Sequence, residues 1–310
     1  MTIGIAASGP MAGLAVYRGL RAVETVGRGA IGGFVSLVAI AEDGTLAEAY
    51  TQRGGALALF GGEGPPPWIA QARLAGLMSS GPDRPEPLIQ FTPADPAVGI
   101  VTGHRLPNMP GPSGEPPNLH ALRLMAAGAS PEEAVLRALE AAPEADAGLI
   151  ALDLDGRIAL GDAPPVLARD DRGRALVEDP ESGLRVGVLH NTIYPIGGLA
   201  ALAAGAAVDA VLPGDAAPEA FRLIGLTVRP GPEHAAHIAP DGAVAVTAPG
   251  PEWLSERWEG SVLRRNDPVY ENGRLAGRVT REVYAILRHG RVAGGRGGET
   301  VGWRRTGGPQ

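Results

Sequence analysis

The second residue, Thr2, stands at the start of a short apolar stretch, TIGIAAS, which is predicted to form a β-strand over residues 2–8. A small second residue normally permits removal of the initiator Met, and this would give Thr2 both a hydroxyl and a free α-amine. A Thr hydroxyl is a poor nucleophile until a base takes its proton, and an α-amine with a pKa of about 8 can serve as that base. Thr2 is therefore a candidate catalytic nucleophile for acyl transfer, and the alternative is an exposed and inert residue.

A second group of functional side chains follows an apolar strand in VTGHRLPNMPG, residues 101–111. Arg105 offers a rigid fork for a carboxylate, and His104 offers a proton that can be exchanged near neutral pH. Asn108 and Thr102 add hydrogen-bond donors and acceptors. We interpret these four residues as candidates for substrate binding, and the alternative is that they brace the loop through hydrogen bonds to its backbone.

The stretch VLHNTIYP places a third polar pair, His190 and Asn191, at the end of a predicted buried strand and before a helix. Polar groups in such a position often face a cleft, so both residues are candidate catalytic residues. The alternative is that they cap the helix that follows.

Two further motifs match the letters of known binding sites but lack the surrounding elements that those sites require. GRGAIG, residues 27–32, matches the dinucleotide pattern GxGxxG, but here a strand rather than a helix leaves the glycines, so no cofactor is expected. His234 and His237 have the spacing of zinc ligands on a helix, but they lack the adjoining Glu and lie between prolines. A loop or strand is the better interpretation, and no metal site is expected.

Composition excludes several classes of protein. The chain has no Cys, and its 27 basic residues are all Arg, so thiolate, pyridoxal and P-loop lysine chemistry are absent. The net charge of −7 with interspersed arginines argues against a nucleic-acid partner, and the most apolar run, residues 199–212, is too short to span a membrane. A small-molecule substrate and a cytoplasmic location are expected.

Local signals give the elements that would position these residues. The stretch GLAV, residues 13–16, is predicted to be a strand beside the first one, and residues 18–26 suit two helical turns. Ser130, Pro131 and Glu133 form a capping box for a helix that pairs with an earlier one over residues 118–126. A hairpin over residues 148–161 follows, with its turn at Asp155-Gly156.

The domain organisation is predicted as a core over residues 1–245, a β-rich extension over 246–295 and a flexible tail over 296–310. The Pro- and Gly-rich region 61–114 is expected to be largely irregular, as either a lid or an oligomer contact. Trp68 and Met109 within it are apolar, which favours a homodimer.

The order of these elements resembles the N-terminal nucleophile (Ntn) hydrolase superfamily. The resemblance covers about the first 160 residues and rests on TIGIAAS, on GLAV with GRGAIGGFVSLVAI, and on GASPEEAVLRALEAAPEADAGLIALDLDGRIALG. It implies an α+β fold arranged as a four-layer αββα sandwich, with Thr2 as nucleophile and its own amine as base. The lysine that proteasome-type members use has no counterpart here.

Three functional hypotheses follow. In the first, the protein is an amidohydrolase acting on a small amide or amino-acid-derived substrate, with oxyanion donors from the glycine-rich strand starts or Asn191 and a substrate carboxylate held by Arg105 and His104. In the second, it is a non-catalytic Ntn-like protein that binds a small molecule or serves in assembly. In the third, it is an enzyme centred on His190, Asn191 and His104 without Thr2.

Overall fold

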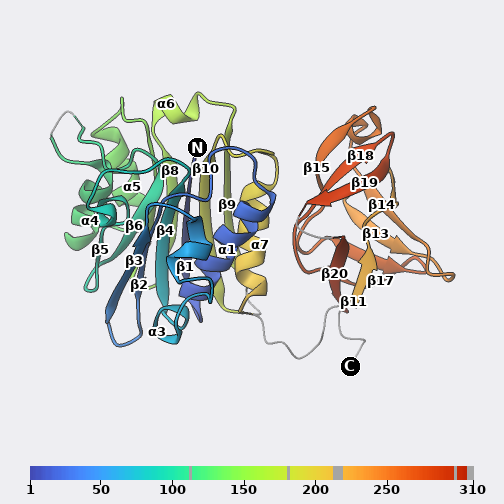
Figure 1. Ribbon diagram of the computed structural model, residues 1–310, viewed down its shortest axis with the longest axis horizontal. Coiled ribbons are helices and arrows are strands. Elements are labelled where there is room, and N and C mark those ends of the chain that lie inside the picture. The colour runs from blue at the N-terminus through green and yellow to red at the C-terminus, as the bar shows by residue number, and fades with distance from the viewer. Residues whose placement is uncertain (112–113, 180–181, 212–218, 297–298, 306–310) are drawn as a thin grey trace. The chain divides into compact units, whose positions relative to one another are not determined.

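The computed structural model describes residues 1–310 except 112–113, 180–181, 212–218, 297–298 and 306–310 (Figure 1). The chain forms two compact units, Met1–Leu212 and Pro213–Gln310, and the mixed α+β class is confirmed. This division differs from the predicted core boundary at residue 245. The strands that begin at Glu219 pair with strands near the C-terminus, so the chain between 219 and 245 belongs to the second unit.

A six-stranded antiparallel sheet forms the centre of the first unit, in the order β3-β2-β4-β1-β10-β9. Its strands are β1 (Thr2–Ser8), β2 (Val35–Ile40), β3 (Leu46–Thr51), β4 (Leu74–Ser80), β9 (Arg172–Asp179) and β10 (Leu184–Asn191). The predicted strand over residues 2–8 is confirmed as β1, and all seven of its residues are buried. Burial on both faces explains why its letters are almost all apolar.

A four-stranded antiparallel sheet packs on one face of the first sheet, in the order β5-β6-β7-β8. Its strands are β5 (Ala94–Asp95), β6 (Gly99–Arg105), β7 (Ala147–Asp153) and β8 (Ile158–Asp162), and the hairpin predicted over 148–161 is β7 with β8. The two sheets approach most closely where β1 meets β6. A Cβ atom at Gly4 would lie 2.4 Å from the carbonyl oxygen of Gly103, so the approach requires glycine at position 4.

Two pairs of helices cover the outer faces of the two sheets, giving the unit four layers (Figure 1). One pair, α1 (Ala12–Val26) and α7 (Leu199–Asp209), packs on the six-stranded sheet. The other pair, α4 (Pro117–Ala126) and α5 (Pro131–Glu140), packs on the four-stranded sheet. The predicted cap of α5 is confirmed, because the Ser130 hydroxyl accepts the backbone N–H of Glu133 at 3.2 Å.

One local prediction in this unit is wrong and another is incomplete. Residues 13–16 are not a strand but the first turns of α1, because Val16 continues the helical spacing of Leu20 and Val23 and all three are buried. Region 61–114 is irregular over much of its length, as expected, but it also supplies two inner strands, β4 and β6. Short helices occur at α2 (Gly55–Leu59), α3 (Pro67–Ala70), η1 (Leu88–Phe91) and α6 (Pro164–Leu167).

The second unit is a curled ten-stranded mixed sheet, in the order β11-β20-β17-β16-β13-β14-β12-β19-β18-β15, with the short helix η2 (Glu252–Leu254) beside it. Its strands are β11 (Glu219–Arg222), β12 (Thr227–Pro230), β13 (Ala235–Ile238), β14 (Val244–Ala248), β15 (Trp258–Leu263), β16 (Pro268–Glu271), β17 (Arg274–Val279), β18 (Val283–Arg288), β19 (Arg291–Arg296) and β20 (Thr300–Arg305). Two of its hairpin turns, Asn272-Gly273 and His289-Gly290, have positive φ at all four residues.

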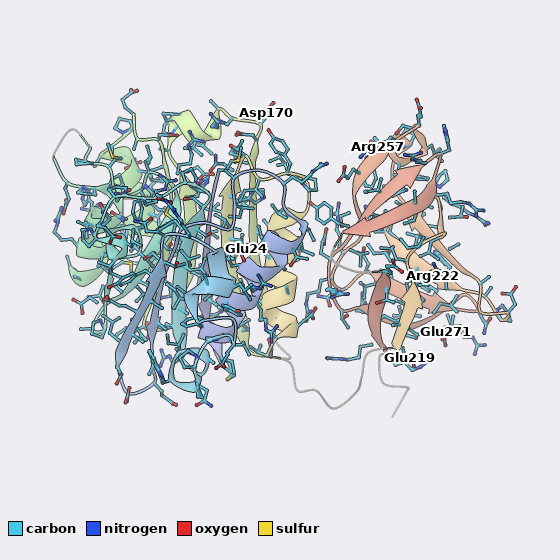
Figure 2. The ribbon with its side chains drawn as sticks, viewed as in Figure 1. Glu24, Asp170, Glu219, Arg222, Arg257 and Glu271 are labelled. Carbon is cyan, nitrogen blue, oxygen red and sulfur yellow. The ribbon has the colours of Figure 1, made fainter. Side chains whose placement is uncertain are left out.

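The predicted flexible tail over 296–310 contains β20, which pairs with β11 and β17. Arg305 of β20 bridges Glu219 of β11 and Glu271 of β16, and the two carboxylates are labelled in Figure 2. Residues 297–298 and 306–310 of that segment lie outside the described residues. Among the helices that are described, none combines the length and the apolar character needed to cross a membrane.

Candidate functional site

Thr2 begins β1 and is only 1% exposed. In the sheet it lies opposite Asn191 of β10 on one side and Ser80 of β4 on the other. Side chains alternate along a strand, so Thr2 shares the face of Gly4, which meets β6. The Thr2 hydroxyl therefore lies in the layer between the two sheets, at the end where β1 begins and β6 and β10 end.

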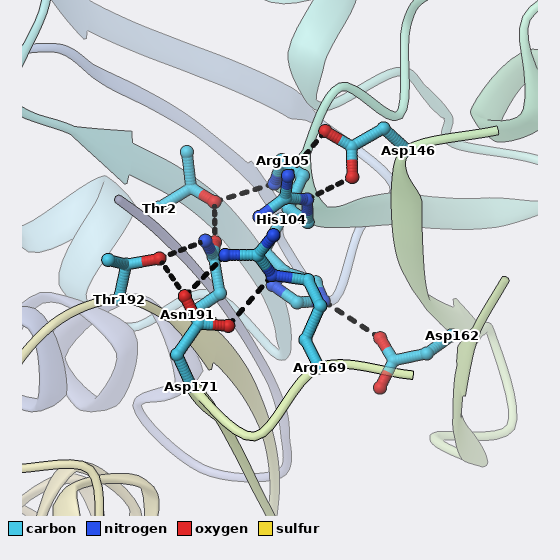
Figure 3. A network of polar contacts seen from close by, with 9 residues as sticks. All are labelled: Thr2, His104, Arg105, Asp146, Asp162, Arg169, Asp171, Asn191 and Thr192. Carbon is cyan, nitrogen blue, oxygen red and sulfur yellow. Dashed lines mark hydrogen bonds and ion pairs between the residues drawn. The ribbon is translucent and has the colours of Figure 1, made fainter. Parts of the chain in front are cut away.

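Two neighbours hold the Thr2 hydroxyl (Figure 3). It donates to Asn191 Oδ1 at 2.6 Å and accepts the backbone N–H of Arg105 at 2.6 Å. The structure thus brings together one residue from each of the three groups that the sequence separates by up to 189 positions. An oxygen fixed by one donor and one acceptor has a defined direction for its remaining lone pair.

A chain of hydrogen bonds orients Asn191 in turn. Its Nδ2 donates to the Thr192 hydroxyl at 2.7 Å, and that hydroxyl donates to Asp171 Oδ2 at 2.6 Å. The ion pair with Arg169, reinforced by the bond from Thr192, lowers the pKa of Asp171 to about 2. Asp171 is therefore an acceptor at any pH near neutrality, which fixes the direction of every bond back to Thr2.

Both residues that flank this network have left-handed backbone conformations, with φ of 66° at Arg105 and 57° at Thr192. A left-handed conformation costs a non-glycine residue about 1 kcal/mol or more, and it is least tolerated by β-branched residues such as Thr. The backbone N–H of Arg105, the last of β6, donates to Thr2 Oγ1. The backbone N–H of Thr192 donates to the Asp171 carbonyl at 2.6 Å.

The Arg105 side chain has a different partner from the one predicted. Its guanidinium makes a two-pronged ion pair with Asp146, with Nη2 at 2.6 Å from Oδ2 and Nε on the other oxygen. The fork that was expected to hold a substrate carboxylate is thus occupied by a carboxylate of the protein. What Arg105 contributes at Thr2 is its backbone N–H.

His104 lies in the layer between the sheets and is fully buried. Its Nε2 is 2.8 Å from Asp162 Oδ1, and the lack of a side chain at Gly148 leaves room for the pair. Arg172 approaches the other oxygen of Asp162 at 3.6 Å. His104 Nδ1 has no partner in the part of the chain that the structure describes. The pair anchors β6 to β8 directly before Arg105.

His190 is on the wrong face of the sheet to act with Thr2. It lies opposite Ile3, and the alternation of side chains places both on the face that α1 and α7 cover, as the contact of Ile5 with Gly19 shows. Burial, followed by the charge of His104, lowers the pKa of His190 to about 4, so the ring is neutral. The structure does not bring this predicted catalytic residue to the site.

Thr102 and Asn108 make bracing contacts, which is the alternative to substrate binding stated for them above. The Thr102 hydroxyl donates to the Leu77 carbonyl at 2.9 Å and ties β6 to β4. Asn108 Nδ2 donates to Gln90 Oε1 at 2.8 Å and braces the loop after β6. Neither side chain is bonded to the Thr2 network.

Sequence reasoning missed the residues that support the network: Asp146, Asp162, Arg169, Asp171 and Thr192. The signal for two of them was present in the acidic, Arg-bearing stretch ARDDRGR, residues 168–174, which leads into β9. Its link to Thr2 depends on the pairing of β9 with β10, which brings Arg172 opposite Asn191. A local pattern does not reveal such a pairing.

The glycine-rich segment 27–32 lies against Met1. The N–H of Ala30 points at the Met1 sulfur, and Gly29, at a φ of 123°, makes room for that side chain. Burial, followed by the positive charges of Arg84 and Arg105, lowers the pKa of the Met1 amine. The amine at the start of the chain is therefore partly buried and lies under the influence of two arginines, while Met1 as a whole remains 41% exposed.

The fold and the site together define a two-unit α+β protein with a buried threonine hydroxyl at the head of a central strand. The chain belongs to the family described as a domain of unknown function, DUF6963, whose model matches residues 2–220. Residues 225–300 match the model of a second domain of unknown function, DUF7259, so the two matches follow the two compact units. A search of curated proteins found no match.

Proposed function

We propose that the protein is an amidohydrolase of the Ntn type, in which Thr2 is the nucleophile once Met1 has been removed. One observation carries the proposal: the buried Thr2 hydroxyl is held between a backbone N–H and an oriented carboxamide oxygen. The four layers of helices and sheets, with the nucleophile at the start of a central strand, are those expected of the superfamily. A cytoplasmic location, which a chain without Cys fits, is part of the proposal.

The proposed reaction balances with groups of this chain and water. Thr2 Oγ1 forms a bond to the carbonyl carbon of the amide while its proton passes to the Thr2 α-amine. The C–N bond then breaks, and the ammonium returns the proton to the leaving amine, which leaves an ester on Thr2. Water attacks this ester with the amine again as base, releasing a carboxylic acid and restoring Thr2.

The surroundings of the N-terminus support the amine as base. The burial and positive charges that lower the pKa of the Met1 amine would act in the same direction on a Thr2 amine in nearly the same place. A lowered pKa leaves more of the amine unprotonated at neutral pH, as a general base requires.

The oxyanion donor that we assign is the N–H of Ala30. In the chain that keeps Met1 this N–H is covered by the Met1 sulfur, and removal of Met1 would free it. Asn191 is a weaker candidate because its Nδ2 already donates to Thr192. We therefore give Asn191 the task of orienting the nucleophile.

The test combines intact mass with hydrolysis of glutaryl, acetyl and alanyl p-nitroanilides. We expect a mass that lacks Met1 and hydrolysis of at least one compound. Thr2→Ala should lower the rate at least about a thousandfold without unfolding the protein, whereas Thr2→Ser should retain measurable turnover. Thr25→Ala is the matched control, because that hydroxyl lies on the surface of α1 and bonds only the Arg21 carbonyl. Full activity of Thr2→Ala would end the proposal.

The contact between the Met1 sulfur and the backbone N–H of Ala30 favours the non-catalytic alternative, because this contact exists only in a chain that keeps Met1. A purified chain that retains Met1 and hydrolyses none of the three compounds would support a binding or assembly protein. The alternative centred on His190, Asn191 and His104 has less support, because the two histidine side chains lie on opposite faces of the six-stranded sheet.

A further inference from the structure

Arg84 is held firmly in the loop after β4. Its backbone N–H donates to Gln52 Oε1 at 2.9 Å, and its carbonyl accepts Gln52 Nε2 at 2.7 Å. Its side chain lies over the buried ring of Phe91, with the guanidinium carbon 5.8 Å from the ring centre. Both ends of the residue are therefore positioned by the protein before any ligand arrives.

The Arg84 guanidinium is close to Thr2. Its Nε donates to the Ser80 hydroxyl at 3.1 Å, and Ser80 lies directly opposite Thr2 in the pairing of β4 with β1. Side chains directly opposite each other in an antiparallel pair share one face, with Cβ atoms about 5 Å apart. The effect of Arg84 on the pKa of the Met1 amine agrees with this proximity.

Arg84 differs from the other two arginines around the site in what it binds. Arg105 is paired with Asp146, and Arg169 is paired with Asp171. Within the described part of the chain, the Arg84 side chain has a hydroxyl and an aromatic ring as partners but no carboxylate. A half-buried guanidinium with unmatched charge is costly unless a ligand supplies the anion.

We infer that Arg84 binds a carboxylate on the substrate, so that the amides hydrolysed at Thr2 are those of acids that carry a second, free carboxylate. The inference rests on the proposed function and corrects the sequence-based expectation that Arg105 holds this group. The two Nη atoms of Arg84 supply the paired donors that a carboxylate takes. The Phe91 ring behind them limits competition from water.

The first experiment measures binding without catalysis. Glutarate and the neutral glutaramide are titrated calorimetrically into the full-length wild type, Thr2→Ala, Arg84→Gln and Arg84→Lys. We expect wild type and Thr2→Ala to bind glutarate alike and glutaramide far more weakly. Arg84→Gln should weaken glutarate binding about tenfold to a hundredfold, and Arg84→Lys less, because lysine keeps the charge but loses the fork. Arg137→Gln on the exposed face of α5 removes the same charge and should change nothing.

A second experiment separates this inference from the proposed function. In hydrolysis, Arg84→Gln should raise KM for glutaryl p-nitroanilide about tenfold or more and leave that for the acetyl compound within about twofold. Glutarate binding that depends on Arg84 in a protein without Thr2-dependent turnover would leave the inference standing and remove the amidohydrolase. Equal glutarate binding by wild type and Arg84→Gln, or no glutarate binding by a folded wild type, would overturn the inference whatever the hydrolysis results.

Discussion

The substitution Gly4→Ala tests whether the close approach of the two sheets creates the Thr2 site. The new Cβ would lie 2.4 Å from the Gly103 carbonyl oxygen, whereas ordinary contacts begin at 3.4 Å, so the strands must separate by 3.4 − 2.4 = 1.0 Å. The bond from the Arg105 N–H to Thr2 Oγ1, now 2.6 Å, would lengthen to 2.6 + 1.0 = 3.6 Å. That distance is beyond the range of a hydrogen bond, which ends at about 3.2 Å.

The expected energetic cost has two parts. Overpacking of a buried contact costs about 1–3 kcal/mol, and the lost hydrogen bond about 1 kcal/mol, so Gly4→Ala should destabilise the first unit by about 2–4 kcal/mol. Urea unfolding followed by circular dichroism measures this loss. Amide hydrogen exchange at Arg105, which should become faster, reports on the bond itself.

Gly197→Ala is the matched control, because a Cβ there meets no atom within 4 Å and the backbone φ is not positive. We expect it to leave stability within about 0.5 kcal/mol of the wild type. Gly4→Ala could instead be as stable as this control, with unchanged exchange at Arg105. In that case the added Cβ does not force the sheets apart, and the reasoning about the site is wrong.

The remaining predictions concern titrating groups. Burial raises the pKa of Glu282 from 4.5 to about 7, so the second unit should be most stable below pH 4.5 and lose about 3 kcal/mol as the pH rises through 7. Glu282→Gln should flatten this profile in urea titrations from pH 4 to 8, and an unchanged slope would refute the assignment. Burial lowers the pKa of His190 from 6.5 to about 4, so the first unit should lose about 3 kcal/mol as the pH falls from 6.5 through 4. His190→Leu should remove this acid sensitivity but not hydrolysis, and loss of turnover in a folded His190→Leu would contradict its placement away from Thr2. Asp171→Asn should lower Thr2-dependent turnover about tenfold to a hundredfold by releasing Thr192 and Asn191, and full activity would show that this chain does not orient the nucleophile.

Elements with local signals could be predicted from the sequence. Ser130 and Pro131 mark the start of α5 through a cap and a fixed φ, and Asn272-Gly273 marks a two-residue hairpin through positive φ values. These signals act within four residues of one another, so no knowledge of the rest of the chain is needed. β1 could be predicted in the same way, because its seven apolar or small residues are typical of a buried strand.

Features that depend on pairing between distant strands could not be predicted. His190 and Asn191 are neighbours in sequence, but the register of β10 with β1 places only Asn191 beside the Thr2 hydroxyl. A shift of one residue would exchange their faces, and nothing within VLHNTIYP fixes that choice. The prediction that Arg105 binds a substrate carboxylate fails for a similar reason, since its partner Asp146 lies 41 residues away.

The distribution of backbone strain connects the fold to the site. Among the described residues, six other than glycine have positive φ, and Asn272 and His289 lie in hairpin turns whose geometry requires it. Arg105 is the last residue of β6, and Thr192 directly follows β10 in the other sheet. Both residues belong to one network around the Thr2 hydroxyl. Because strain of this kind persists only where the surroundings enforce it, its presence at two residues of the network around the Thr2 hydroxyl supports the proposed chemistry at Thr2 without resemblance to any family.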